Sequence, residues 1–551
     1  EMKHQSSSEI SQLVDFAHEL ARLSGAVILP HFRQSIEYSL TNNYAILDIA
    51  SKQKDDFLFN MYKMGKNAIE AGSRDTWTMY PKRIEAVRAE VDRQRGARGG
   101  RGGAPVAMYT DMLRDPALRD PRGFVLPSDQ PDFLTATKFI NILIKAGVVV
   151  HRATAPFSAS GKSYPAGSYV VKTAQAFRAH VMDMFEPQDH PNDFPYPGGP
   201  PRAPYDVTGY NLSYSMGVRF DRILESFDGP FEKLPGTVSA PPGRVASAPS
   251  GGGYMIGPET NDAFIGVNRL LKANEDVYRL RNGALFVPAK ATVLPILQRL
   301  AAERGLNVAG SATPSPAEMT RLRTMRVGLW DQYGGSMPSG WTRWLLEQFE
   351  FPFEVVFQKG LDAGNLASRF DVLIFVDGAF PAREAPAGVQ PAADRVPPEY
   401  RDHLGSVSAS RTVPELKRFV EAGGTLIAIG SSTSLGRDLG LPIRSALVER
   451  AGGVESPLDS DKFFVPGSIL EARVDRSHPL AFGLGDRVNV FFDHSEAFRL
   501  LPEAAQRGVK AVAWFDGPTP LKSGWAWGQQ YLDQAVQIID APLGKGHVVL
   551  F

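Results

Sequence analysis

Cysteine is absent from this chain of 551 residues. Its absence excludes disulfides, thiolate metal ligands and cysteine nucleophiles. Net charge is also absent, because 60 basic side chains balance 60 acidic ones. No overall field therefore draws the chain toward nucleic acid or an anionic membrane. No apolar run approaches the roughly 20 residues of a transmembrane helix. We accordingly expect neither nucleic acid nor a membrane as a partner, and the sequence carries no signal for an oligomeric state.

A zinc-binding motif is missing as well. Ten histidines are present, but none belongs to an HExxH motif and none is followed three positions later by glutamate. These are the spacings in which zinc hydrolases hold their metal. The sequence therefore predicts no metal site and no cofactor in this chain.

At 551 residues the chain is long enough for about three domains of roughly 150 residues each. The order of helical, strand-like and Pro/Gly-rich stretches along it predicts several segments. Residues 9–33 and 36–69 have helical periodicity, and the Arg/Gly-rich run 88–103 is typical of an exposed linker. An RNA-binding role for that run is the alternative. The expected segments are a helical N-terminal segment ending in this linker (1–103), an α/β unit with a Pro-rich extension (104–240), a second α/β unit (254–320) and a larger α/β domain (325–551). The Pro-rich extension contains enough aromatic residues that we expect it to pack over a surface.

An internal repeat links the two smaller units. Residues 141–152 read NILIKAGVVVHR and residues 268–279 read NRLLKANEDVYR, with identical residues at six of twelve positions. Each copy follows a strand-like segment and precedes a hairpin-like run and a helix. The alternative is that any junction of helix and strand looks alike, but the shared polar positions favour a duplicated small α/β region.

The region 325–551 alternates strands and helices, from MRVGLW through DVLIFVD to GTLIAI, and then becomes rich in strands. This alternation predicts a doubly wound, mostly parallel sheet with extra strands. The fold class expected for the whole chain is therefore α/β.

Two places in this domain are candidate sites. Ser431 and Ser432 follow the strand 424–429 as a nucleophile would at a strand-to-helix turn, with His494 or His478 as the base. The pattern departs from G-x-S-x-G, because Ser434 stands where the second glycine belongs.

The second candidate is the loop after MRVGLW, which precedes a helix. It contains Asp331, Tyr333, Ser336, Ser339 and Arg343. In an open α/β sheet ligands bind at the carboxyl ends of strands, and a helix N-terminus attracts anions. We expect a small anion or a peptide carboxylate to bind there, with Arg343 as its partner; a purely structural turn is the alternative.

Several stretches resemble long bacterial members of the M14 zinc carboxypeptidase family. They are FLFNMYKMGKNAIEAG, DTWTMYPKRIEAV, FVLPSDQPD, the block from YPAGSYVV to NLSYSMGV, GLWDQYGGSMPSGWTRWLLEQF, HPLAFGLGDRVNVFF and SGW followed by GKGHVVLF. The resemblance covers about residues 36–551 and implies the region that follows the peptidase domain, including a module similar to class I glutamine amidotransferases. In that family zinc is bound through HxxE and a later histidine, and this chain has no HxxE.

Two further resemblances complete the comparison. Residues 10–33 resemble the first helix of inositol-monophosphatase-like phosphatases, whose later acidic metal motifs are missing here. Amidotransferases place a cysteine at their nucleophile turn, whereas this chain has Ser431 and Ser432. A serine hydroxyl is far less acidic than a thiol, so the resemblance implies a binding or scaffolding domain rather than amide transfer.

The expected function is that of an accessory, non-catalytic part of an M14-like zinc carboxypeptidase, whose zinc would lie in a catalytic domain outside this chain. Its partners would be that peptidase domain in cis or a peptide substrate. Because the sequence starts on Glu1 and stops after a strand-like HVVLF, we expect a piece of a longer protein, and the family favours a periplasmic or extracellular location. The alternatives are a serine-based hydrolase and a module that binds a small anion or peptide carboxylate.

Overall fold

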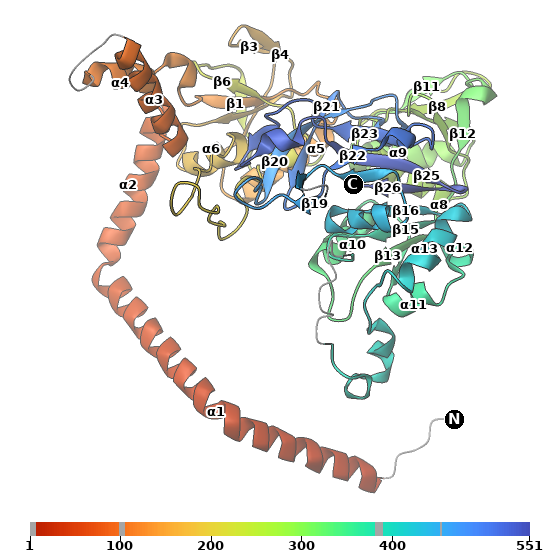
Figure 1. Cartoon of the computed structure of the whole chain (residues 1–551). Coiled ribbons are helices and arrows are strands. Elements are labelled where there is room, and N and C mark those ends of the chain that lie inside the picture. The colour runs from red at the N-terminus through yellow and green to blue at the C-terminus, as the bar shows by residue number, and fades with distance from the viewer. Residues whose placement is uncertain (1–6, 98–104, 381–389, 452–453) are drawn as a thin grey trace. The chain divides into compact units, whose positions relative to one another are not determined.

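The computed structural model describes residues 7–97, 105–380, 390–451 and 454–551. The chain divides into two compact units, Glu1–Glu70 and Ala71–Phe551. Helices and sheets both contribute, so the chain has the predicted α/β class (Figure 1). Within the described ranges, no helix combines the length and the apolar character that crossing a membrane requires.

Two long helices account for most of the first unit. Helix α1 spans Ser7–Lys52 and α2 spans Lys54–Gly72. The stretches 9–33 and 36–69 are helical, as predicted. Helix α1 continues through Pro30, however, so the break between the two helices comes after Lys52 and not near residue 34. Large apolar side chains are exposed along both helices, among them Tyr44, Leu47, Leu58 and Met61.

The predicted Arg/Gly linker is helical over much of its length. Helix α3 spans Pro81–Ala97, and α4 follows at Val106–Leu113. Residues 88–97 of the expected linker are therefore helical, since Arg, Glu, Gln and Ala favour helix, and Val91 within them is fully buried. Residues 98–103 lie outside the described residues.

The first α/β unit is built on a five-stranded antiparallel sheet in the order β6-β1-β5-β2-β7. Its strands are β1 (Gly123–Leu126), β2 (His151–Ala153), β5 (Tyr169–Lys172), β6 (Asp221–Ile223) and β7 (Phe231–Lys233). Helix α5 (Phe133–Lys145) follows β1 and α6 (Arg178–Phe185) follows β5, and both contribute to one buried apolar cluster with the sheet. Asp132 caps α5 by accepting a hydrogen bond from the Thr135 N–H at 3.1 Å.

The second α/β unit has a five-stranded sheet with the same connectivity. Its strand order is β11-β8-β10-β9-β12. Position by position this matches the order β6-β1-β5-β2-β7 of the first sheet, so that β8 corresponds to β1 and β10 to β5. The elements are β8 (Gly253–Ile256), α8 (Ala263–Lys272), β9 (Tyr278–Leu280), β10 (Leu285–Pro288), α9 (Val293–Arg304), β11 (Ala309–Ser311) and β12 (Met319–Arg321). Common ancestry of the two units stays a prediction, and so do the domain boundaries.

Residues shared by the two repeat sequences occupy the same places in these units. Leu143 and Leu270 are fully buried on α5 and α8. The chain then leaves each helix through a residue with positive φ, Gly147 at +91° and Asn274 at +58°. Glycine and asparagine are the residues that adopt this conformation at least cost, which explains why the two copies differ there by that exchange.

The large domain has a parallel sheet in the order β14-β13-β15-β16-β26. The strands are β13 (Val327–Trp330), β14 (Phe353–Val356), β15 (Val372–Phe375), β16 (Thr425–Ala428) and β26 (Gly546–Leu550). Helix α10 (Met337–Gln348) connects β13 to β14, and α13 (Thr412–Glu421) connects β15 to β16. The chain moves outward from β13 on one side and then on the other, which is the predicted doubly wound arrangement.

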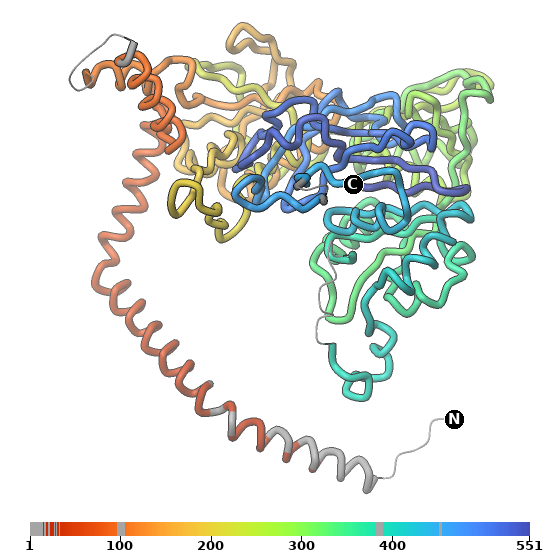
Figure 2. Tube along the Cα trace, viewed as in Figure 1, coloured from red at the N-terminus to blue at the C-terminus, as the bar shows by residue number. Residues whose placement is uncertain are grey.

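The extra strands extend the same sheet in the antiparallel direction. Strand β26 lies beside β16, far from it in sequence (Figure 2), and pairs on its other side with β25 (Val536–Leu543). The sheet continues through β23 (Lys510–Trp514), β20 (Ser468–Val474) and β21 (Arg487–Phe492).

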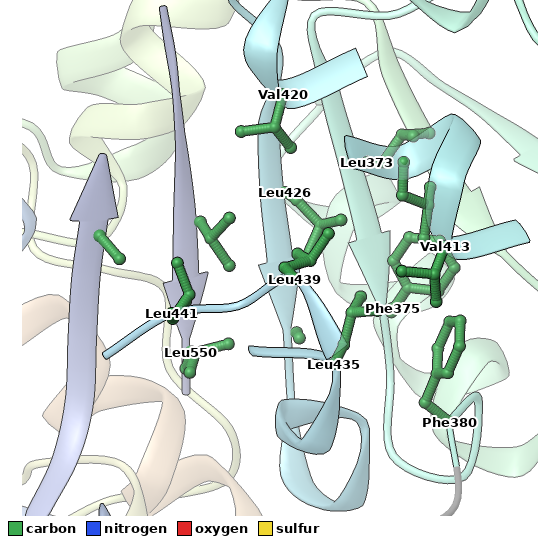
Figure 3. Packing of buried hydrophobic residues seen from close by; sticks show 14 of the residues in the cluster. Leu373, Phe375, Phe380, Val413, Val420, Leu426, Leu435, Leu439, Leu441 and Leu550 are labelled. Atoms are coloured by element: carbon green, nitrogen blue, oxygen red, sulfur yellow. The ribbon is translucent and has the colours of Figure 1, made fainter. Parts of the chain in front are cut away.

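An apolar core packs around β16, which lies between β15 and β26 in the parallel part of this sheet (Figure 3). Leu426 and Ala428 are fully buried on β16, and Leu373 and Phe375 are fully buried on β15. Val420 of α13 packs in the same cluster. Burial of each large apolar side chain stabilises the fold by roughly 1.5–3 kcal/mol, so the strand that leads to the serine turn is held firmly.

The Pro-rich segment 186–218 packs on the C-terminal strands, as predicted. The Gln188 N–H donates to Ser523 Oγ at 2.9 Å, and the Thr208 N–H donates to the Gly467 carbonyl at 2.8 Å. The rings of His190 and Trp525 stack with their centroids 5.2 Å apart. The segment therefore joins the first α/β unit to the C-terminal strands.

Candidate functional site

The turn after β16 has the strand-to-helix geometry expected from the sequence. It starts at Gly430, where φ is +60° and an added Cβ would lie 2.5 Å from Asp377 Oδ1. Residues Gly430–Ser434 form a 3-10 turn that leads into the short helix α14, Leu435–Asp438. Glycine is required at this position both for the backbone angle and for the close approach of the carboxylate.

The two candidate serines at this turn are bonded to the loop that follows β15. Ser432 is fully buried; its hydroxyl donates to the Val376 carbonyl at 2.6 Å and accepts from the Phe380 N–H at 3.0 Å. Ser431 Oγ accepts from the Gly378 N–H at 2.9 Å. A nucleophilic serine must give its proton to a base, whereas the Ser432 proton goes to a main-chain carbonyl. The geometry is that of a structural clamp.

The candidate base His494 lies near the end of β21 and is largely exposed. Its Nδ1 is 2.7 Å from Asp493 Oδ1. The other candidate, His478, is buried, with Nε2 3.2 Å from Asp540 Oδ2. In the described part of the chain, no hydrogen bond connects either histidine to Ser431 or Ser432. The described residues of the chain contain no group of three or more histidine, cysteine, aspartate or glutamate side chains that could hold a metal ion.

The loop after β13 brings its predicted residues together at the start of α10. Ser336 caps the helix by accepting from the Ser339 N–H at 3.4 Å. Asp331 is buried, accepts from the Gln332 N–H at 2.8 Å and lies 4.0 Å from the guanidinium of Arg343.

This arrangement gives the loop little net attraction for an anion. The Asp331 carboxylate lies beside the guanidinium of Arg343 and partly offsets its positive charge. Ser339 Oγ is fully buried without a hydrogen-bond partner among the described residues, and Tyr333 is partly buried. The loop lies at the carboxyl end of β13, as the sequence predicted, and the strand order places it at the switch point between β13 and β15.

A larger site lies elsewhere, in a polar cleft of about 1160 Å³ within the second unit. It is bounded by the first α/β unit, by the chain around the start of α3 and by the C-terminal strands β20 and β21. Its lining includes Tyr80, Asp129, Tyr214, Arg219, Arg222 and Asn489. No single stretch of sequence contains enough of these residues to reveal the cleft, which the fold assembles from distant segments.

Most charges in this polar cleft are paired with one another. Arg222 Nε lies 2.8 Å from Glu186 Oε1, and Lys162 Nζ lies 2.6 Å from Asp221 Oδ2. The side chain of Arg219 is exposed and has no ion-pair or hydrogen-bond partner among the described residues.

Asp129 is likewise exposed, and its carboxylate has no such partner in the described ranges. Arg219 and Asp129 therefore offer a ligand a positive and a negative charge whose side chains have no partner among the described residues.

Two tyrosines supply neutral hydroxyls to the polar cleft. Burial raises the pKa of Tyr214 to about 12, with a further contribution from the nearby Glu186 carboxylate. Burial also raises the pKa of Tyr80, in the same direction as the carboxylates of Glu186 and Asp120. Both hydroxyls keep their protons at neutral pH and can donate hydrogen bonds to a ligand.

Comparison with known proteins adds only structural neighbours. No family model matches the chain, and no curated protein does. A glutamine amidotransferase from Thermotoga maritima is similar over 41% of this chain and 75% of its own, at 12% identity and a TM-score of 0.23. A GMP synthase component from Thermoplasma acidophilum is similar over 41% of this chain and 83% of its own, at 10% identity and a TM-score of 0.25.

A β-galactosidase from Bacillus circulans is similar over 41% of this chain and 28% of its own, at 11% identity and a TM-score of 0.22. Amidotransferase-like proteins are thus among the structural neighbours. At these TM-scores the similarity decides nothing about what the chain does.

Proposed function

We propose that this chain is a non-catalytic, peptide-binding part of an M14-like zinc carboxypeptidase, and that its polar cleft receives the peptide. One observation carries the proposal. Stretches that resemble that family, although far apart in sequence, converge on this cleft: DTWTMYPKRIEAV supplies Tyr80, FVLPSDQPD supplies Asp129, NLSYSMGV supplies Tyr214 and HPLAFGLGDRVNVFF supplies Asn489.

The chemistry of the polar cleft suits a peptide with free ends. Arg219 can pair with a terminal carboxylate, and Asp129 can pair with a terminal ammonium group. Tyrosine hydroxyls and the Asn489 amide can bond the peptide groups between them. The bonded serines at the turn after β16 and the lack of an HxxE motif support a role without catalysis. The peptidase domain would act in cis, and an exported location would follow from the family.

Binding of an unblocked pentapeptide, measured by calorimetry, tests the proposal. Arg219→Ala should weaken binding roughly 10- to 100-fold, the effect of losing one hydrogen bond to a charged group. Amidation of the peptide carboxylate should weaken binding to the wild type by a similar factor and have little further effect in Arg219→Ala. Asp129→Ala should act in the same way with acetylation of the amino end.

Matched controls are Lys417→Ala and Asp438→Ala, which remove exposed charges outside the polar cleft. Absence of peptide binding, or equal losses in the control variants, would overturn the cleft assignment. Stoichiometric zinc together with peptide hydrolysis by this chain would overturn the non-catalytic role.

A further inference from the structure

A second cavity, of about 590 Å³, lies between the second α/β unit and the large domain. Helix α8 forms one wall with Phe264 and Val267. The segment before β14 contributes Phe351, and the loop after β20 contributes Leu480 and Phe482. This volume is within the range of small-molecule sites, and the lining is mostly apolar as such sites are.

Close packing of main chain against side chain holds the walls of this apolar cavity in place. An added Cβ at Gly283 would lie 2.5 Å from the Phe482 Cβ, and one at Gly483 would lie 2.2 Å from the Pro258 carbonyl oxygen. Gly283 and Gly483 also have φ of +86° and +88°. The loop with Phe482 is therefore seated directly on the second α/β unit, and the cavity is formed before any ligand arrives.

One cation in the apolar cavity has no anionic partner. Arg321 pairs with Asp276, and Arg323 pairs with Asp371. Arg279, on β9, contacts the ring of Phe482 at 5.9 Å but has no hydrogen-bond or ion-pair partner for its guanidinium among the described residues. A guanidinium that lies over a ring keeps its N–H donors free for a planar anion, and carboxylate is the best geometric match.

We propose that the apolar cavity binds a small molecule with an apolar chain or ring and a single carboxylate. The apolar part would lie against Val267, Phe264 and Leu480, and the carboxylate would pair with Arg279. This site is independent of the polar cleft, because the two share no lining residue. It therefore stands or falls separately from the peptide-binding proposal.

Octanoate and 1-octanol test this proposal, because they share the apolar chain and differ in the carboxylate. With the full chain in calorimetry, octanoate should bind at least about tenfold more tightly than octanol, the size of one charge-assisted hydrogen bond. Arg279→Ala and the bulkier Arg279→Gln should both remove that preference. Arg281→Ala is the matched control and should keep the preference, because the exposed Arg281 side chain donates to the Ala317 carbonyl at 3.2 Å and does not line the cavity.

A second pair of variants tests the location. Val267→Trp should fill the apolar cavity and abolish binding of both probes, whereas Val106→Trp on the exposed start of α4 should leave binding unchanged. Thermal melting of each variant establishes that it is folded before titration. The proposal is overturned if octanoate does not bind the wild type, or if it binds equally well after Arg279→Gln or Val267→Trp.

Discussion

The hydroxyl of Ser432 donates a hydrogen bond of 2.6 Å to the main-chain carbonyl of Val376. The same oxygen accepts from the Phe380 N–H, so this one buried side chain satisfies a donor and an acceptor of the loop after β15. The turn that resembles a nucleophile site in sequence thus joins two parallel strands at their carboxyl ends.

Replacing Ser432 by alanine should therefore lower the stability of the fold. Ser432→Ala leaves two buried main-chain groups unpaired and should lower the free energy of unfolding by roughly 1–3 kcal/mol. Ser431→Ala, at a less buried position, should cost less. Denaturant unfolding measures both changes. Labelling of Ser432 by a fluorophosphonate probe would contradict the structural role and support the alternative that the chain is a serine-based hydrolase.

Removing one partner of the buried ion pair between Asp120 and Arg178 should be costly, because the other charge is then buried without its partner. Their side chains are 2.9 Å apart, and Asp120 also accepts from Thr76 Oγ1 and the Thr78 N–H. Asp120→Ala leaves the guanidinium of Arg178 buried and unpaired, so we expect a loss of about 3–5 kcal/mol in unfolding free energy.

The double variant Asp120→Ala/Arg178→Met removes both charges and should lose less than the sum of the single changes. The matched control is Asp486→Ala, which breaks the exposed pair with Arg476 and should cost at most about 1 kcal/mol. Additive losses in the double variant would argue against coupling of the two buried charges.

Asp371 should make stability depend on pH in acid. Hydrogen bonds from Arg326 and then Arg323 hold the pKa of this carboxyl well below its usual range. The unfolded value is about 3.9, so the stabilisation is complete above about pH 4 and is lost as pH falls toward the lower pKa of the folded state. Asp371→Asn should flatten the decline of unfolding free energy below pH 4. Asp438→Asn removes an exposed carboxylate and should leave the decline unchanged.

Gly147 and Asn274 occupy equivalent turns of the two small units, and introducing a side chain at the first should differ in its effect on stability from removing one at the second. Gly147→Ala forces a side chain to φ +91° and places Cβ 2.9 Å from the Phe177 ring, so it should destabilise the protein by roughly 1–2 kcal/mol. Asn274→Gly relieves a side chain at φ +58° and should be neutral or stabilising by less than about 1 kcal/mol. A larger loss for Asn274→Gly than for Gly147→Ala would show that the turns are not equivalent.

Periodicity and turn residues predicted the fold better than they predicted the sites. The parallel strands of the large domain are short apolar runs bounded by turns, and their alternation with helices was visible in the sequence. The repeat was visible because Leu143 and Leu270 occupy matching core positions. The helix over residues 88–97 was not predicted, because Arg and Gly dominate the composition of the run and hide the helix-favouring Glu, Gln and Ala around the buried Val91.

For the candidate sites, the sequence showed where a turn lies but not which distant residues it contacts. The turn at Ser432 was located correctly, but hydrogen-bond partners such as Val376 are not encoded locally, so its structural role was not visible. The polar cleft combines Asp129 and Arg219 with strands from the far end of the chain, and the lone charge of Arg279 becomes notable only once its neighbours are known.

The Pro-rich segment 186–218 has a consequence for how the protein unfolds. Because its main chain bonds to Ser523 and Gly467, the first sheet cannot separate from the C-terminal strands without breaking contacts of both. Unfolding of the first sheet should therefore be accompanied by unfolding of the C-terminal strands, in a single cooperative transition. Calorimetry should record one shared transition for these two regions, and a protease that nicks the loop near residue 250 should leave the fragments associated.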